Sequence, residues 1–338
     1  MNRKEEKEMA RIYYSLFGPF IVKFIALKNS LGYKYKDAGR TFSHLDTLAL
    51  KNNLSEVAIT KELAEEHGLK RPNETEKTRY NRVQLLGQFA QFLCDIGIRS
   101  YIPRLPKSHS MFTPYIFSSD EMHSIFKECD ALAPSVRHRN SAVFAIPFLI
   151  RLLYGTGIRI GEALYLSTGD IHPEEGYLIV RDTKNGKDRL IPFSGSMRTV
   201  CENYLMYRAL FPGAHKNDRL LILPDGRLLE QSVAYRWFRK IIWSAGISHG
   251  GRGKGPRLHD LRHTFSVHSL ASMAREGLDM YHSLPLLSTY LGHQSLGATD
   301  GYVRLTAEMY PDLLKRSGIV IANVFPVFKT ESDDDQDH

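Results

Sequence analysis

The feature that most constrains the fold is one β-hairpin signal in a chain that is otherwise patterned for helices. Between Gly176 and Ser194, the β-prone runs YLIVRDT and KDRLIPF flank Asn185-Gly186. An Asn-Gly pair in this setting strongly indicates a tight hairpin, because both residues tolerate the left-handed backbone that the turn requires. The hairpin places Lys184 beside the turn, at the tip of a two-stranded ribbon.

Elsewhere the apolar residues recur at helical spacing. Within Tyr80–Ile96 they fall three or four positions apart, which predicts a helix that stops before Gly97. The same pattern in Ile21–Leu31 ends at Gly32, and the chain from Ser232 onward is mostly helical in pattern. The sequence therefore predicts a mainly α fold with a small β-sheet, of the α+β class.

A proline-rich stretch suggests where the chain divides. Residues 101–114 contain three prolines and few periodic apolar residues, and prolines block the continuation of a helix. A helix start follows, where Ser118-Ser119-Asp120-Glu121 offers capping residues. We expect a helical domain over residues 1–105, a linker at 106–113, a second domain over 114–317, and an apolar segment with an acidic tail at 318–338.

Charge and composition limit the class of protein. The net charge is +8, and both halves are basic once the acidic tail ESDDDQDH is set aside, which suits a polyanionic partner and also an ordinary basic protein. No apolar run is long enough to span a bilayer, and no signal peptide is apparent. The three cysteines are too widely spaced for a disulfide scaffold or a cysteine-based zinc site. We expect a soluble, intracellular protein.

Chemically versatile side chains gather in four places, of which two precede residue 190. Arg159 follows a tight turn and has Glu162 three residues on, so the carboxylate can hold the guanidinium on one helix face. Taken alone, an Arg–Glu pair at this spacing is more often an ordinary ion pair on a helix surface. Lys184 lies at the hairpin tip, and Lys187 is so close that the chemistry alone does not choose between them.

The third place is the stretch LHDLRHTF. His259 and Arg262 are three residues apart and share a helix face, while His259 and His263 have the spacing of a zinc-binding pair. A zinc protease helix needs Glu after the first histidine, but Asp260 stands there, and Arg262 would oppose a metal cation. A zinc-dependent hydrolase remains an alternative from a different class.

The fourth place contains His293 and, nine residues later, Tyr302. Taken with the other three, it completes a set suited to phosphoryl transfer without a metal. Two guanidiniums can neutralise a phosphate, an imidazole can accept a proton from a phenol, and an ammonium can protonate a leaving alkoxide. The phenol itself can act as the covalent nucleophile.

Four segments in a fixed order resemble the tyrosine recombinase (phage integrase) family. They are TGIRIGEALYL, TKNGKDRLIP, HDLRHTF and LGHQSLGATDGY, and they span residues 154–304. The helical region before them is similar to the core-binding domain of the family. The stretch from His259 to His293 is longer than in Xer-type resolvases, and LPLLSTYLGH resembles the integrases carried by transposons.

The resemblance implies roles for individual residues. Arg159 and Arg262 would clamp the scissile phosphate, and Lys184 would protonate the leaving 5′ oxygen. His259 would be the general base, His293 would contact the phosphate, and Tyr302 would attack it. Glu162 and Asp260 would support these residues, whereas His263 would have no catalytic role. The implied catalytic set is Arg159, Lys184, His259, Arg262, His293 and Tyr302.

The resemblance also implies partners and a setting. The substrate would be double-stranded DNA, cleaved through a 3′-phosphotyrosyl intermediate by a homo-tetramer on two sites, without cofactor, metal or membrane. Arg252, Lys254 and Arg257 would contact DNA phosphates near the cleavage point. The protein would serve a mobile element, with sister recombinases as possible partners, in the prokaryotic cytoplasm at the nucleoid. A type IB topoisomerase-like relaxing enzyme is the alternative with the same chemistry.

The segment after the candidate nucleophile is unusually apolar. Ile319–Phe328, IVIANVFPVF, is strongly apolar and precedes the acidic tail. A monomer does not leave so apolar a stretch exposed. It either folds back onto its own domain or docks on a neighbouring protomer, and the sequence leaves both open.

Overall fold

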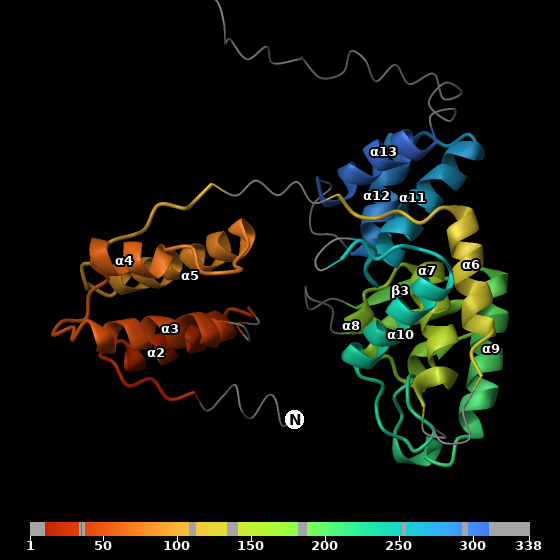
Figure 1. The fold of residues 1–338 in the computed structure, drawn as a ribbon, viewed down its shortest axis with the longest axis horizontal. Helices are drawn as coiled ribbons and strands as arrows, with labels where there is room; N and C mark the ends of the chain where they lie inside the picture. Colours follow the sequence, from red (N-terminus) through yellow and green to blue (C-terminus); the bar gives the residue numbers. More distant parts are fainter. Residues whose placement is uncertain are drawn as a thin grey trace, which may run out of the picture. The chain divides into compact units, whose positions relative to one another are not determined.

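The computed structural model describes residues 11–33, 35, 38–107, 113–133, 141–181, 188–251, 255–292 and 297–310. Contacts divide the chain into an N-terminal unit, Met1–Phe112, and a C-terminal unit, Thr113–His338. Each unit is described by itself below (Figure 1). Both are built mainly from helices, and the described residues contain one three-stranded sheet, so the expected α+β class is confirmed.

In the described residues of the N-terminal unit, four helices pack around an aromatic core. Phe24, Phe42 and Phe89 are fully buried, and their rings pack edge to face with centroids 5.3–5.7 Å apart. Each such pair contributes about 0.5–1.5 kcal/mol beyond the burial of its area. The two helices that the apolar spacing predicted are confirmed. The helices are α2 (Gly18–Ser30), α3 (Ala38–Lys51), α4 (Lys61–Gly68) and α5 (Glu76–Asp95).

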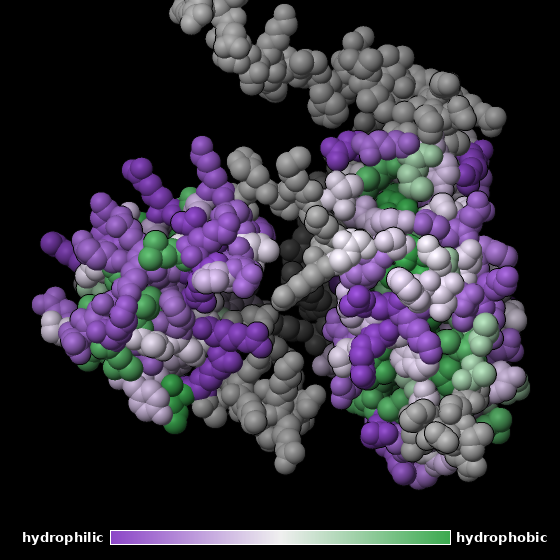
Figure 2. Space-filling view, viewed as in Figure 1, coloured by the Kyte–Doolittle hydropathy of each residue, from purple (hydrophilic) through white to green (hydrophobic). Residues whose placement is uncertain are grey.

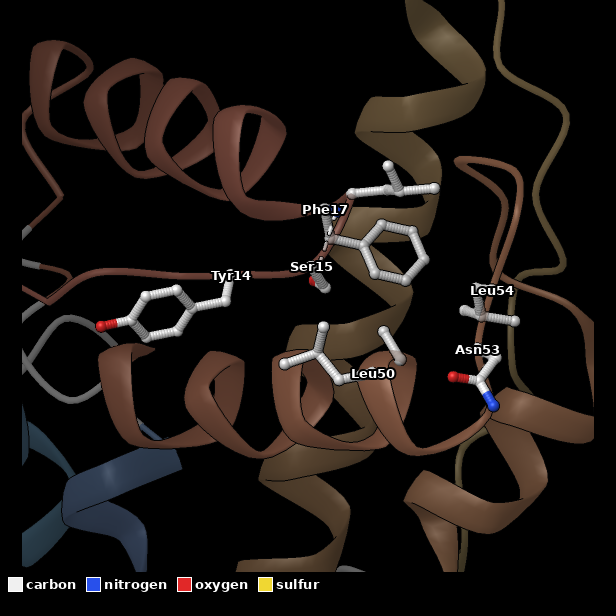
Figure 3. Close-up of a pocket in the computed structure, with 8 residues that line it drawn as sticks. Tyr14, Ser15, Phe17, Leu50, Asn53 and Leu54 are labelled. Carbon is white, nitrogen blue, oxygen red and sulfur yellow. Dashed lines mark hydrogen bonds between the residues drawn. The ribbon is translucent and has the colours of Figure 1, made fainter.

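A groove runs along α3 of this unit. Figure 3 shows Phe17, Leu50 and Leu54 around it, and its volume is about 330 Å³. Two residues that line the groove are tied to α3, because the buried carboxylate of Asp46 accepts hydrogen bonds from the backbone N–H groups of Tyr14, at 2.9 Å, and Ser15, at 2.8 Å. The outer face of the unit in Figure 2 is mostly hydrophilic, with isolated apolar side chains.

The C-terminal unit begins at the predicted helix start. Ser118 caps α6 through a reciprocal pair of hydrogen bonds with Glu121, a motif that satisfies two of the amide groups left open at a helix start. Helix α7 is apolar on nearly every face and lies in the core. The helices are α6 (Ser119–Asp130), α7 (Ile146–Thr156), α8 (Ile160–Tyr165), α9 (Gly195–Ala209), α10 (Gln231–Ser244), α11 (Asp260–Arg275), α12 (Met280–Leu291) and α13 (Gly297–Met309), with 3₁₀ turns at Ala142–Phe144, Thr168–Asp170 and Ala214–Lys216.

The sheet contains the predicted hairpin strands. Strand β2 (Tyr177–Val180) pairs antiparallel with β3 (Arg189–Pro192), and this part of the expectation is confirmed. The turn between them, with Lys184, lies outside the described residues. A third strand, β1 (Ile171–His172), pairs with the other edge of β2. The sequence did not indicate it, because two residues are too few to show alternation.

Helix α11 is the organising element of the C-terminal unit. It packs against α7, α12 and α13 (Figure 1), and a cluster of buried side chains that includes Tyr302 joins the last three helices. Two of the cysteines, Cys129 and Cys201, are buried here, and burial raises the pKa of each thiol to about 12. In the described part of the chain, no helix combines the length and apolar character needed to cross a membrane.

Candidate active site

A glycine turn sets the position of the first candidate residue, Arg159. Helix α7 ends at Gly157, whose backbone has the left-handed φ of 60°. A Cβ at this position would lie 2.3 Å from the ring of Phe265, so only glycine fits. The turn leaves Arg159 at the N-cap of α8, one residue before the helical turn in which the sequence pattern placed it.

Glu162 holds two arginines in this region. One carboxylate oxygen accepts from Nη1 of Arg159 at 2.8 Å, and the other accepts from the Arg159 backbone at 2.9 Å and from Nη2 of Arg189 at 3.1 Å. Burial raises the pKa of Glu162, but the Arg159 backbone hydrogen bond and the two guanidiniums outweigh it, so the pKa is lowered. The predicted Arg159–Glu162 pair is confirmed. The pattern gave no signal for Arg189, which reaches Glu162 from β3.

Arg262 is buried at the start of α11. Its Nη1 donates to the carbonyl of Gly157 at 2.7 Å, and its Nη2 donates to the carbonyl of Leu291 at 2.8 Å. Burial, followed by the charge of Arg159, lowers the pKa of Arg262 to about 10. The guanidinium therefore stays protonated at neutral pH, and the structure brings the two candidate arginines together.

His259 lies at the N-cap of α11, with an exposed edge. The protein around its ring removes much of its hydration, and this desolvation, followed by the charges of Arg262 and Arg159, lowers its pKa to about 4. The imidazole is therefore neutral at pH 7 and able to accept a proton. Its ring lies 4.9 Å from that of His263, at a right angle.

Tyr302, the candidate nucleophile, projects from α13 into the interior and is only 5% exposed. Its phenolic oxygen lies 2.9 Å from Nδ1 of His263. Burial raises the pKa of Tyr302, and the charges of Arg262 and Arg159 oppose the rise. The family resemblance gave His263 no role, and its spacing suggested only zinc. The structure nevertheless makes it a direct neighbour of the phenol.

Of the remaining expected residues, the structure describes Asp260 and Arg257. Asp260 is buried, accepts from the backbone N–H of Arg257 at 2.7 Å, and has its pKa raised by burial to about 6. Arg257 itself is exposed. Residues Lys184, Arg252, Lys254 and His293 lie outside the described residues. Among the residues that are described, no group of three His, Cys, Asp or Glu side chains is arranged to hold a metal ion.

Comparisons with known proteins identify the family to which the chain belongs. A model described as the phage integrase family matches residues 116–309, more than half of the chain. The putative integrase/recombinase y4rB of Sinorhizobium fredii is 28% identical over 309 residues, which cover 89% of this chain and 97% of that protein. The tyrosine recombinase XerA of Pyrococcus furiosus is 31% identical over 179 residues, which cover 51% of this chain and 54% of that protein.

Solved structures share the fold at lower identity. XerH recombinase bound to its difH substrate superposes with a TM-score of 0.62 and 20% identity, over 83% of this chain and 79% of that chain. The Tn1549 transposon integrase with transposon right end DNA gives 0.60 and 16%, over 88% and 98%. A lambda integrase tetramer bound to a Holliday junction gives 0.55 and 17%, over 84% and 76%. The family match and the ordered motifs together show that the chain belongs to the phage integrase family, the tyrosine recombinases.

Proposed function

We propose that the chain is a site-specific DNA recombinase of a mobile element, an integrase or transposase, that cleaves and rejoins DNA through a 3′-phosphotyrosyl bond at Tyr302. One observation carries the proposal: the neighbouring residues Arg262 and His263 of α11 join the parts of the site. Arg262 donates to the carbonyl of Gly157, two residues before Arg159, at 2.7 Å, and Nδ1 of His263 lies 2.9 Å from the phenolic oxygen of Tyr302. Two guanidiniums beside a phenol form a site in which a phosphodiester can be held and attacked.

The arginines would hold the non-bridging oxygens of the scissile phosphate. Each guanidinium carries five N–H donors, so Arg262 can keep its bonds to backbone carbonyls while it also binds an anion. Glu162 fixes Arg159 from the side, with a hydrogen bond of 2.8 Å. Preorganised cations of this kind stabilise the charge that grows in the transition state.

Proton transfer would complete the cycle. His259 is neutral near pH 7 because its pKa is lowered, so it can accept the proton as the phenol attacks. Lys184 would donate a proton to the departing 5′ oxygen, and His293 would contact the phosphate. A 5′ hydroxyl of the partner strand then attacks the phosphotyrosine. The ester bond is exchanged rather than hydrolysed, so the reaction needs no external energy source.

The partner would be duplex DNA, bound by a homo-tetramer on two sites. A lambda integrase of the same fold forms a tetramer bound to a Holliday junction, which supports the assembly of four protomers. The C-terminal unit contains an apolar cavity of about 410 Å³, lined in part by Phe265, Leu287 and Tyr290. The apolar segment Ile319–Phe328, which lies outside the described residues, has the composition to fill such a cavity on a neighbouring protomer. Sister recombinases of the same element would be further partners.

The loop before α11 would lie along the DNA backbone. Arg257 is exposed there, and its backbone is fixed by Asp260 at 2.7 Å. Arg252 and Lys254 precede it in the same glycine-rich loop. Three cations on one loop can neutralise neighbouring phosphates without reading the bases.

A plasmid with two copies of the element end tests this function. We expect recombinant products, equally in buffer and in excess EDTA. Relaxed topoisomers without recombinants would favour a type IB topoisomerase-like enzyme instead. Loss of activity in EDTA would favour a zinc-dependent hydrolase.

A further inference from the structure

The N-terminal unit contains a group of buried polar atoms that its own residues do not satisfy. In the described part of the chain, eight buried side-chain nitrogen or oxygen atoms have no hydrogen-bond partner, and five of them belong to this one group. Buried donors are normally paired, and a charged one nearly always is. The five atoms belong to His44, His67, Arg71 and Arg82.

These four side chains come from separate elements and meet at one place. His44 projects from α3 and His67 from α4, and their rings lie 5.3 Å apart. Arg71 lies in the connection that follows α4, and Arg82 lies on α5. Nη2 of Arg82 donates to the carbonyl of Leu69, two residues after His67, at 2.8 Å, which places this guanidinium beside the end of α4. Burial, followed by the charge of Arg82, lowers the pKa of His67 to about 3.

The acids of this region are already engaged. Glu74 receives Nε and Nη2 of Arg82 at 3.0 and 2.8 Å, and it also accepts the backbone N–H of Arg71 at 3.1 Å. Glu66 accepts from Lys51 at 2.9 Å and from Asn52 at 2.8 Å. Neither carboxylate forms a hydrogen bond with Nη2 of Arg71 or Nη1 of Arg82, the two guanidinium nitrogens without a partner. The two guanidiniums of Arg71 and Arg82 are thus balanced by one carboxylate, that of Glu74. The group therefore carries a net positive charge.

The open nitrogens suit one kind of ligand. A surplus positive charge with guanidinium donors matches a tetrahedral oxyanion, which accepts several hydrogen bonds at once. A metal cation would be repelled by both arginines. His67 is 1% exposed and Arg82 is 5% exposed, whereas His44 and Arg71 reach the surface in part. An oxyanion could therefore enter from the side of His44 and Arg71.

We propose that His44, His67, Arg71 and Arg82 form a binding site for one phosphate-type oxyanion in the N-terminal unit. The anion is either free inorganic phosphate or a phosphate of the DNA backbone. Only the second source rests on the proposed function. The site itself does not, because it needs neither Tyr302 nor strand cleavage.

Titration of the full chain with inorganic phosphate tests the site. Imidazole nitrogens labelled with ¹⁵N report on His44 and His67, with sodium chloride at matched ionic strength as the reference. We expect a saturable change in both histidines with phosphate and none with chloride. Arg71→Gln removes an open donor without breaking a side-chain hydrogen bond found among the described residues, so it should fold and bind phosphate about tenfold more weakly. Arg99→Gln, which removes an exposed charge from the same unit, should bind as the wild type does.

DNA then distinguishes the two sources. If the anion is a backbone phosphate, duplex DNA changes the same histidine signals, and phosphate weakens DNA binding more than chloride does, unless Arg71 is replaced. If DNA leaves both signals unchanged while phosphate saturates them, the site takes the free anion. The proposal is overturned if neither phosphate nor DNA changes the histidines beyond the chloride reference, or if Arg71→Gln binds phosphate normally.

Discussion

The phenolic oxygen of Tyr302 lies 2.9 Å from Nδ1 of His263, so the candidate nucleophile is hydrogen-bonded inside its own protein. Only 5% of Tyr302 is exposed, and a side chain so enclosed cannot touch a DNA phosphate where it lies. Attack therefore requires the phenol to exchange its bond to His263 for contact with the substrate. Arg159 and Arg262, by contrast, are already held in place by hydrogen bonds to Glu162 and to backbone carbonyls.

Replacing Glu162 tests how strongly the fixed position of Arg159 affects the rate of DNA cleavage. Glu162→Gln keeps the size of the side chain but removes the charge that pairs with Arg159 and Arg189. Cleavage of a nicked substrate in a single turnover should slow about tenfold or more, because Arg159 loses its orientation. DNA affinity should change much less. Glu202→Gln, on an exposed face, is the control, and equal cleavage rates for the two variants would contradict the role of Glu162.

Asp260 predicts a specific pH dependence of stability. Burial raises its pKa to about 6 from the ordinary value of 3.8, so the folded state binds the proton more tightly than the unfolded state does. Its ionisation therefore costs stability progressively as the pH rises from about 4 to about 6, by at most about 3 kcal/mol. Urea unfolding of Asp260→Asn should show a stability difference from the wild type that grows over this range and is then constant. The exposed Asp218→Asn is the control, and a flat difference for Asp260→Asn would refute the argument.

The general acid can be identified chemically. Lys184→Ala should cleave ordinary DNA slowly and recover on a substrate with sulfur at the 5′ bridging position, because a thiolate leaves without a proton. Lys187→Ala is the matched control. Recovery by Lys187→Ala alone would move the role to Lys187.

Removal of residues 318–338 tests where the apolar segment docks. If it docks on a neighbouring protomer, the shortened protein stays folded and binds one DNA site, but it no longer pairs two sites cooperatively. Analytical ultracentrifugation with one-site and two-site DNA measures both properties. An insoluble or destabilised monomer would show docking within the same chain, and normal tetramers with normal recombination would exclude the role in assembly.

Local sequence signals predicted much of this molecule. The strands on either side of Asn185-Gly186 are present, because their turn and their β-prone residues are adjacent in the chain. The Arg159–Glu162 pair is present because three residues of separation fix both side chains on one turn. Such signals need no knowledge of the tertiary fold.

The contacts that complete the site could not be predicted in this way. Arg262 meets the carbonyl of Gly157, 105 residues earlier, and His263 meets Tyr302, 39 residues later. These distances along the chain leave no periodic pattern, and packing alone brings the groups together. The sequence therefore gave no sign that His263 lies beside Tyr302.

Covalent attachment of Tyr302 to DNA can be detected directly. The protein is trapped on a suicide substrate nicked beside the cleavage point, digested, and analysed by mass spectrometry. The account predicts that the peptide containing Tyr302 carries the 3′ phosphate of the DNA, and that Tyr302→Phe binds the substrate without forming an adduct. An adduct on another residue, or equal trapping of Tyr302→Phe, would contradict it.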